Sequence, residues 1–247
     1  MIRIRGLAKR LGTKQVLDGL DLEIATGETV VVIGRSGTGK SVLLKHIVGL
    51  MEPDRGAIEI DGEDIVGMKE SDLNRIRMRF GMLFQGSALF DSLTVGENVG
   101  LALREHLRLP AAEIRRRVAE RLEWVGLQGV EDMKPASLSG GMRKRVGLAR
   151  AIAMDPAFIL YDEPTTGLDP IMADVIDQLI RDMQRRLQVT SVVVTHDLAS
   201  AFKVGDRFAM LDQGRIIFQG TPEEMRSTAH PLARQFMEGT SAGPVRA

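Results

Sequence analysis

The chain has 247 residues, of which 44% are hydrophobic and 27% charged, as in an ordinary soluble globular protein. The 33 lysines and arginines are balanced by 33 acidic residues, so there is no net positive charge to attract nucleic acid. The absence of cysteine excludes disulfides, thiolate metal sites and a cysteine nucleophile. The strongest apolar runs are far shorter than the roughly 20 residues that span a bilayer, so a membrane function would require another polypeptide.

The first 65 residues predict mostly short strands. Apolar side chains alternate along three segments, at residues 2–4, 20–24 and 58–60. Asp61-Gly62 is typical of a hairpin turn. The run TVVVIG at 29–34 is continuously apolar, which indicates a strand buried on both faces, and the 3–4 spacing of apolar residues over 43–48 predicts a helix after it.

A helical lobe is predicted from about 86 to 154, because apolar residues from Ile114 to Val125 fall on one helical face. Two more buried strands are expected at AFILYDE (157–163) and TSVVVTHD (190–197), with a long amphipathic helix between them. Strand–helix–strand order implies a parallel sheet with crossover helices. Residues 207–220 resemble a closing hairpin, and a loose tail is expected from about Glu238.

The octapeptide GRSGTGKS at 34–41 matches G-x-x-x-x-G-K-[ST] between a buried strand and a helix. Its glycines let successive backbone N–H groups point inward, toward a polyphosphate. Lys40 can reach the β- and γ-phosphates, and the Ser41 hydroxyl can ligate Mg²⁺. The alternative, a glycine-rich turn without a ligand, leaves the lysine without a packing purpose. The predicted phosphate-loop contacts are Gly34, Arg35, Ser36, Gly37, Thr38, Gly39, Lys40, Ser41 and Val42.

Polar residues also end three other apolar runs. Asp162 is expected to hold Mg²⁺, and Glu163 to orient or deprotonate the attacking water. Taken alone, these acids could equally be solvated or cap a helix, and the phosphate loop favours the catalytic interpretation. His196 could hydrogen-bond the γ-phosphate or the water, although a lone histidine is usually structural. The Gln85 amide could ligate both Mg²⁺ and the water.

The segment LSGGM at 138–142 has two interpretations. Either Ser139 caps a helix after a loose glycine turn, or the glycines let the backbone approach a phosphate. The chain resembles the nucleotide-binding subunits of ABC transporters over nearly its whole length. The resemblance is carried by six motifs in this order: the phosphate loop, Gln85, LSGGM, FILYDE, TTGLD (165–169) and His196. This resemblance implies ATP and Mg²⁺ as cofactors. It also implies an α/β fold: a P-loop NTPase (RecA-like) core with an N-terminal antiparallel β subdomain and an inserted α-helical subdomain.

The resemblance further implies one nucleotide-binding domain over 1–240, with the helical subdomain at about 86–154 and a flexible tail at 241–247. In this family two protomers share two sites, so that Ser139, Gly140 and Gly141 would face the γ-phosphate bound to the other protomer. Asp169 would lie at the dimer contact.

Two positions depart from the family pattern. Met142 replaces the usual glutamine of the signature segment, and Leu11 stands where an aromatic residue often stacks on adenine. We expect apolar contact from Leu11 or Val16 instead, with weak discrimination among purine nucleotides.

A finer resemblance, to the ATPases of Mla-type phospholipid-transport systems that partner MCE proteins, comes from MLFQGSALFDSLTVGENV, LREHLRLP, LSGGMRKRVGLARA and the terminal RQFMEG. It implies a homodimer on the cytoplasmic face of the bacterial inner membrane. The dimer would drive two copies of a permease subunit, coupled to a periplasmic MCE-domain protein, with a small STAS-domain subunit as a further partner. The complex would move phospholipid that this chain does not itself bind, and no nucleic acid would be involved.

Several alternatives remain open at the level of sequence. Leu89, Phe90 and Leu93 would meet the permease, or equally pack in the core. Arg115–Arg117 and the 143–145 run are expected to be solvated helix faces rather than lipid-headgroup sites. The ATPase of a small-solute importer, for example one for amino acids, shares every catalytic motif. A soluble ABC ATPase acting on DNA or ribosomes is disfavoured by the neutral charge, and a silent scaffold by the complete catalytic set.

Overall fold

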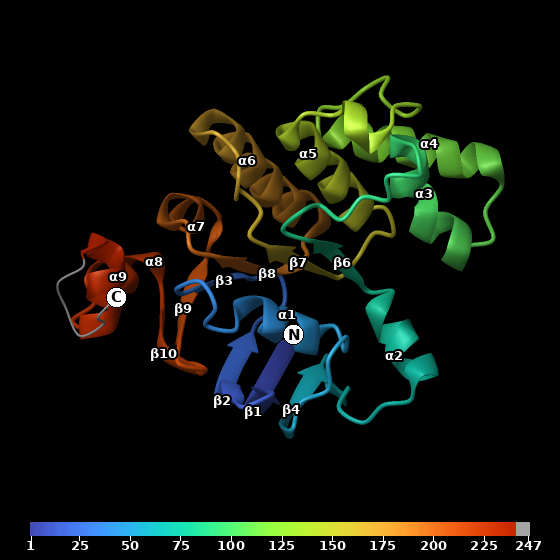
Figure 1. The fold of residues 1–247 in the computed structure, drawn as a ribbon. Coiled ribbons are helices and arrows are strands. Elements are labelled where there is room, and N and C mark those ends of the chain that lie inside the picture. Colours follow the sequence, from blue (N-terminus) through green and yellow to red (C-terminus); the bar gives the residue numbers. More distant parts are fainter. Residues whose placement is uncertain (241–247) are drawn as a thin grey trace. The chain divides into compact units, whose positions relative to one another are not determined.

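A computed structural model of the protein describes residues 1–240 (Figure 1). The described chain divides into two compact units. The first unit combines residues 1–77 with residues 190–240, and the second comprises residues 78–189. The tail expected at 241–247 lies outside the described residues.

An antiparallel sheet opens the first unit, in the strand order β2-β1-β4-β5. The alternating apolar side chains predicted for this region are almost completely buried, with Ile2, Leu20 and Ile60 at 0% exposure. Asp61 and Gly62 both have positive φ, which confirms the predicted hairpin between β4 and β5. The strands are β1 Ile2–Leu11, β2 Lys14–Ile24, β4 Arg55–Ile60 and β5 Glu63–Asp64.

The second sheet of this unit brings together segments far apart in the sequence. Strand β3 (Thr29–Ile33) pairs in parallel with both β8 (Thr190–Thr195) and β9 (Arg207–Asp212), and β10 (Arg215–Gly220) pairs antiparallel with β9. Every residue of β3 and β8 is buried, as their continuous apolar runs predicted. The expected parallel pairing and the closing hairpin are therefore confirmed.

Helices of the first unit flank these strands. Helix α1 packs on β8, and α7 packs on both β3 and β8. The predicted helix at 43–48 is confirmed as α1, whereas α2, α7, α8 and α9 were not predicted. The helices are α1 Lys40–Ile47, α2 Glu70–Arg77, α7 Leu198–Val204, α8 Pro222–Arg226 and α9 Pro231–Glu238.

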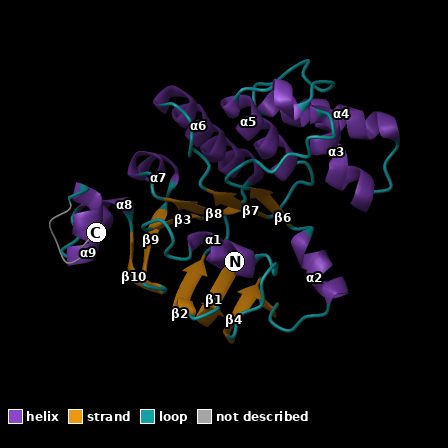
Figure 2. Cartoon of the chain, viewed as in Figure 1, coloured by secondary structure: helices purple, strands orange, loops and turns teal. Residues whose placement is uncertain are grey.

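The second unit is mostly helical, with the parallel strands β6 (Phe80–Leu83) and β7 (Phe158–Asp162) (Figure 2). Val118 and Leu122 on α4 are buried, so the predicted apolar face of this lobe is confirmed. A Cβ at Gly81 would overlap the Ala151 carbonyl oxygen, so β6 passes the end of α5 more closely than a side chain allows. The helices are α3 Val95–His106, α4 Ala111–Trp124, the 3₁₀ turn Pro135–Ser137, α5 Gly140–Ala151 and α6 Pro170–Leu187.

No helix within residues 1–240 combines the length and the apolar character needed to cross a bilayer.

Candidate functional site

The glycine-rich loop begins directly after β3 and ends at the first residue of α1. A Cβ at Gly34 would overlap the carbonyl oxygen of Leu211, and Gly37 has a φ of 77°. Gly39, the residue before α1, has a φ of 106° and no side chain to cap the helix. The first turn of α1 therefore begins without a side-chain cap, the arrangement in which helix N-termini bind phosphate.

The Lys40 side chain folds back over this loop. Its ammonium donates to the Gly34 carbonyl at 2.8 Å and to the Arg35 carbonyl at 3.1 Å, and the residue is only 6% exposed. Thr38 Oγ1 also donates to the Arg35 carbonyl, at 2.9 Å. The ammonium thus lies over the loop, where it could exchange these hydrogen bonds for hydrogen bonds to phosphate oxygens.

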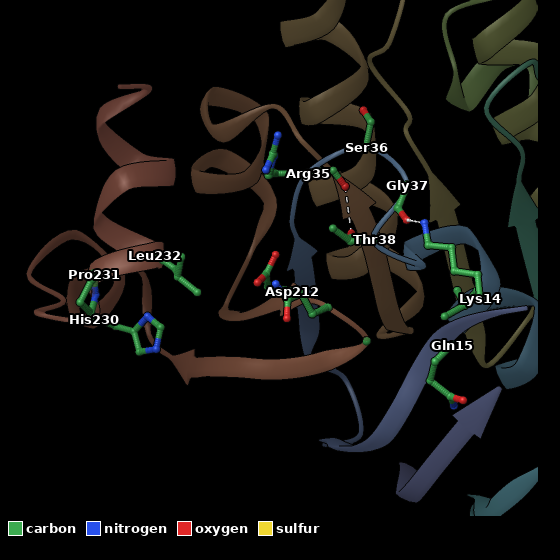
Figure 3. Close-up of a pocket in the computed structure, with 13 residues that line it drawn as sticks. Lys14, Gln15, Arg35, Ser36, Gly37, Thr38, Asp212, His230, Pro231 and Leu232 are labelled. Carbon is green, nitrogen blue, oxygen red and sulfur yellow. Dashed lines mark hydrogen bonds between the residues drawn. The ribbon is translucent and has the colours of Figure 1, made fainter. Parts of the chain in front are cut away.

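A cleft of about 760 Å³ opens beside the loop (Figure 3). Val16 lines it, as predicted for a nucleobase contact, whereas Leu11 is 42% exposed and is not among the lining residues. The sequence interpretation missed most of the remaining wall, because that wall comes from turns that lie far away along the chain. The lining residues are Lys14, Gln15, Val16, Arg35, Ser36, Gly37, Thr38, Asp212, Gln213, Gly214, His230, Pro231 and Leu232.

Two basic side chains, Lys14 and Arg35, line the loop side of this cleft. The Lys14 ammonium points at the Gly37 carbonyl, to which it donates at 3.4 Å, and Arg35 lies across the loop from it (Figure 3). Ser41 and Val42 belong to the first turn of α1. The Val42 carbonyl oxygen lies 2.7 Å from Nδ1 of the His46 ring, at hydrogen-bond distance. Two cations beside an uncapped helix terminus favour a polyphosphate here.

His196 lies at the same sheet edge as the glycine-rich loop. Parallel β3 and β8 are in register at Ile33 and Thr195, so Gly34 and His196 both follow the carboxyl ends of adjacent strands. The imidazole is exposed. Asp197 next to it caps α7, accepting from the Ala199 N–H at 2.9 Å, which holds the turn that carries the histidine.

A matching edge exists in the second unit. Parallel β6 and β7 are in register at Leu83 and Tyr161, so their carboxyl ends lie at the same edge. Gln85 follows the end of β6, and Asp162 and Glu163 lie at the end of β7. Both acids are only 8% exposed, and Gln85 is exposed. The Glu163 carboxylate accepts from Thr166 Oγ1 at 3.2 Å. The structure therefore brings Gln85, Asp162 and Glu163 together at one edge, as predicted for carboxyl ends of parallel strands.

Both interpretations of the 138–142 segment find support. Ser139 caps α5, and its Oγ accepts from the Met142 N–H at 3.2 Å. A Cβ at Gly141 would lie 2.6 Å from Met172 Cε, so this glycine also lets α5 pack closely on α6. Ser139 and Gly140 are exposed, and a Cβ at Gly140 would meet nothing closer than 3.8 Å. Packing within the second unit therefore does not explain the glycine at position 140, and the approach of a phosphate there stays a prediction.

The basic run at 143–145 corrects one sequence expectation. Arg143 is exposed, but Lys144 is 5% exposed and donates to the backbone carbonyls of Gln85 and Glu163, the latter at 3.1 Å. The expected solvated face is therefore wrong for Lys144. The expectation of a solvated helix face is met by the run Arg115–Arg117, in which Arg116 and Arg117 form ion pairs with Glu113 at the surface.

The loop after Gln85 is held by one buried amide. Asn98 Oδ1 accepts from the Phe90 N–H at 2.8 Å, while Asn98 Nδ2 donates to the carbonyls of Phe90 and Thr94 at 3.1 and 2.9 Å. Phe90 itself is 52% exposed, so the core-packing alternative is wrong for this residue. Leu89 and Leu93 are half-buried. An anchored loop thus presents an aromatic side chain at the surface.

Replacing this amide is expected to loosen the loop. Asn98→Ala leaves the Phe90 N–H without its acceptor and removes the amide's donations to the carbonyls of Phe90, Leu93 and Thr94, so it should lower the free energy of unfolding by about 1–3 kcal/mol. Urea denaturation measures this change. Asn74→Ala, on the exposed face of α2, is the matched control and should change stability by less than about 0.5 kcal/mol. Equal stabilities for the two variants would show that Asn98 does not anchor the loop.

The loop, its uncapped helix and the lysine folded over it define a P-loop nucleotide-binding protein. The comparisons with known proteins extend this class. A family model described as "ABC transporter" matches residues 17–166. The chain therefore belongs to the ABC transporter family of ATP-binding proteins, and it hydrolyses ATP.

Individual relatives are similar along nearly the whole chain. A probable ribonucleotide transport ATP-binding protein, mkl, of Mycobacterium leprae is 43% identical over 99% of this chain and 70% of its own length. The intermembrane phospholipid transport system ATP-binding protein MlaF of Haemophilus influenzae is 40% identical over 100% of this chain and 93% of its own length. A dimeric ATP-binding cassette, MJ0796, solved in a post-hydrolysis state with ADP and Pi, is 34% identical, with a TM-score of 0.83 over 90% of this chain and 98% of that one.

Proposed function

We propose that this chain is the ATP-hydrolysing subunit of a transporter that moves phospholipid between bacterial membranes. The observation that carries the proposal is the similarity to MlaF, at 40% identity over 93% of the relative's length. On this proposal the nucleotide-binding domain is residues 1–240. Two copies work as a homodimer on the cytoplasmic face of the inner membrane, against two copies of a permease subunit, an MCE-domain protein and a STAS-domain subunit.

The roles of the site residues follow from their chemistry. The backbone of residues 34–42, with Lys40, holds the β- and γ-phosphates of ATP, and Val16, which lines the cleft where Leu11 does not, offers apolar contact to the base. Glu163 orients and deprotonates the attacking water, while Gln85 and His196 hydrogen-bond the water and the γ-phosphate. Gly140, with Ser139 and Gly141 beside it, presents bare backbone at a helix N-terminus to the nucleotide of the other protomer.

The donors available for Mg²⁺ are the Ser41 hydroxyl, the Gln85 amide oxygen and the Asp162 carboxylate. Within the described chain no group of three or more His, Cys, Asp or Glu side chains could hold a metal by itself. Each of these groups is an oxygen donor of the kind that suits Mg²⁺, which is bound by one or two carboxylates together with substrate phosphates and water. Bound there, Mg²⁺ would neutralise charge on the β- and γ-phosphates.

The partner-facing surface is proposed on the loop of residues 89–94. Phe90 is exposed on a loop whose backbone is held by Asn98. A permease that displaces Phe90 would therefore also displace Gln85, which lies five residues earlier in the chain. Asp169 caps α6 with two hydrogen bonds of 3.0 Å, next to Ile171, which is 77% exposed. An exposed apolar side chain at a capped helix start supports the dimer contact proposed there.

Ribonucleotide transport is the second candidate, because the mkl relatives are 43% identical to this chain. The importer of another small solute is a third, since it would use the same ATPase site.

One purification separates these candidates. The chain, tagged at its N-terminus, is recovered from gently solubilised membranes, and mass spectrometry identifies the bound proteins and lipids against an untagged strain. We expect a permease, an MCE-domain protein and phospholipid. A permease with a solute-binding protein would replace the lipid assignment by small-solute transport, and recovery only with soluble partners would overturn the transport assignment.

A transport assay with the recovered complex in liposomes then tests the substrate. Fluorescent phospholipid should move in an ATP-dependent way, and the same complex carrying Glu163→Gln should not move it. ATP-dependent movement of radiolabelled ribonucleotide without movement of phospholipid would favour the second candidate.

A further inference from the structure

The Lys144 ammonium joins the two polar strand ends of the second unit. It lies in the second turn of α5, beyond the capped start at Ser139. From there it donates to the carbonyl of Gln85, 59 residues earlier, and to the carbonyl of Glu163, 19 residues later. Both acceptors are backbone atoms, so the contact restrains the course of the chain at Gln85 and Glu163 without using their side chains.

Keeping a cation in this place is energetically costly, which argues against an incidental contact. Lys144 is 5% exposed, and burial lowers the pKa of its ammonium, while the nearby Asp162 and Glu163 carboxylates oppose that shift. A buried charge persists where its hydrogen bonds are satisfied. Here the two carbonyls, rather than a carboxylate, receive them.

Backbone strain occurs at the residues that this helix holds. Glu163 has a φ of 49°, in the left-handed region that residues with a Cβ rarely occupy. Ser87 and Ala88, just after Gln85, have φ values of 62° and 45°. The carbonyls of these two residues accept from Arg150 of the same helix, at 2.6 and 2.7 Å. Two cations of α5, the buried Lys144 and the half-buried Arg150, thus bind the carbonyl oxygens of these three left-handed residues, Glu163, Ser87 and Ala88.

We propose that Lys144 is a positioning residue: it holds the Glu163 backbone in the left-handed conformation that aims the carboxylate, and it ties that conformation to the Gln85 loop and to α5. The inference rests on the proposed function, in which Glu163 activates water and the start of α5 meets a nucleotide. A displacement of α5 or of the Gln85 loop then changes the aim of Glu163. The ATPase step thereby becomes sensitive to whether the partner and the second nucleotide are in place.

The variant Lys144→Met tests this role. It keeps the length of the side chain, removes the donor and should lower kcat for ATP about 10- to 100-fold, with KM changed less than about threefold. Lys144→Arg keeps a cation with several donors and should restore kcat to within about fivefold of the unchanged protein. Steady-state phosphate release, nucleotide affinity and thermal denaturation are measured on the same preparations.

Arg145→Met is the matched control. Arg145 lies on the same helix and also donates to two backbone carbonyls, those of Val125 and Gly126, which belong to neither strand end. A purely structural role for Lys144 predicts equal losses of kcat in the two variants at equal losses of stability. That result would overturn the inference. We expect instead that only Lys144→Met lowers kcat beyond the loss of folded protein.

The Glu163→Gln background distinguishes failure of this inference from failure of the proposed function. If Lys144 acts through Glu163, adding Lys144→Met to Glu163→Gln should lower turnover less than about twofold further. A full additional loss would overturn the positioning role. Unchanged turnover in Glu163→Gln alone would instead remove Glu163 from the proposed function. If Lys144→Met does not fold, Lys144→Gln replaces it, because its shorter, uncharged amide cannot donate to both carbonyls as the ammonium does, and full kcat in that variant would equally overturn the inference.

Discussion

Glu163→Gln is expected to reduce ATP turnover by about 100- to 10,000-fold, the contribution of a positioned general base. The amide has the same size as the carboxylate and can still accept from Thr166 Oγ1, which lies 3.2 Å from Glu163 Oε2. It cannot take a proton from water. Binding of ATP should be retained, so the variant should accumulate as an ATP-bound dimer.

Two measurements check this result. Phosphate release gives the turnover, and size-exclusion chromatography with ATP and Mg²⁺ reports the dimer. Glu105→Gln, an exposed glutamate on α3, is the control and should behave like the unchanged protein. Turnover that is equal in the two variants would contradict the role given to Glu163.

Lys40→Ala is expected to abolish turnover for a different reason, namely loss of nucleotide binding. The ammonium is held over the loop by the Gly34 and Arg35 carbonyls, and charge-assisted hydrogen bonds to phosphate are among the stronger ones. Their removal should weaken ATP binding about 10- to 100-fold. Glu163→Gln should therefore bind ATP without hydrolysing it, while Lys40→Ala should do neither.

Calorimetric titration with ATP and Mg²⁺ measures the affinity directly. Lys45→Ala, an exposed lysine on the same helix α1, is the matched control and should leave affinity within about twofold. Thermal denaturation of both variants checks that the loop still folds when the Gly34 and Arg35 carbonyls no longer accept from Lys40. ATP affinity in Lys40→Ala equal to that of the control would mean that the backbone of the loop alone holds the phosphates.

Most of the strands and the parallel sheet edges could be predicted from sequence because their signals are local. Buried β3 and β8 are continuous apolar runs, and the polar residues Gln85, Asp162 and His196 stand at or just after strand ends in the sequence. Parallel pairing then places strand ends together within each unit. The helices α2, α7, α8 and α9 span only five to eight residues, too few for a clear helical period, and among them α8 alone has a capping box, formed by Thr221 and Glu224.

The far wall of the cleft could not be predicted. His230, just before α9, and Asp212, at the end of β9, line the same cleft as the phosphate loop, and nothing in their local sequence indicates which cleft they will line. The same applies to the buried amide of Asn98, whose partners are the backbone groups of a loop without a recognisable pattern.

The sequence by itself determined the phosphate loop, its lysine, the order of the polar strand ends and the family, because each motif is a short run of residue types and the order of the motifs is that of the chain. Only the tertiary structure decided that Lys144, in a run of three cations, is buried while Arg143 is exposed. A charge on a helix is solvated or buried according to what packs on that face. Here two backbone carbonyls, 59 and 19 residues away along the chain, supply the hydrogen bonds that make burial of the ammonium tolerable.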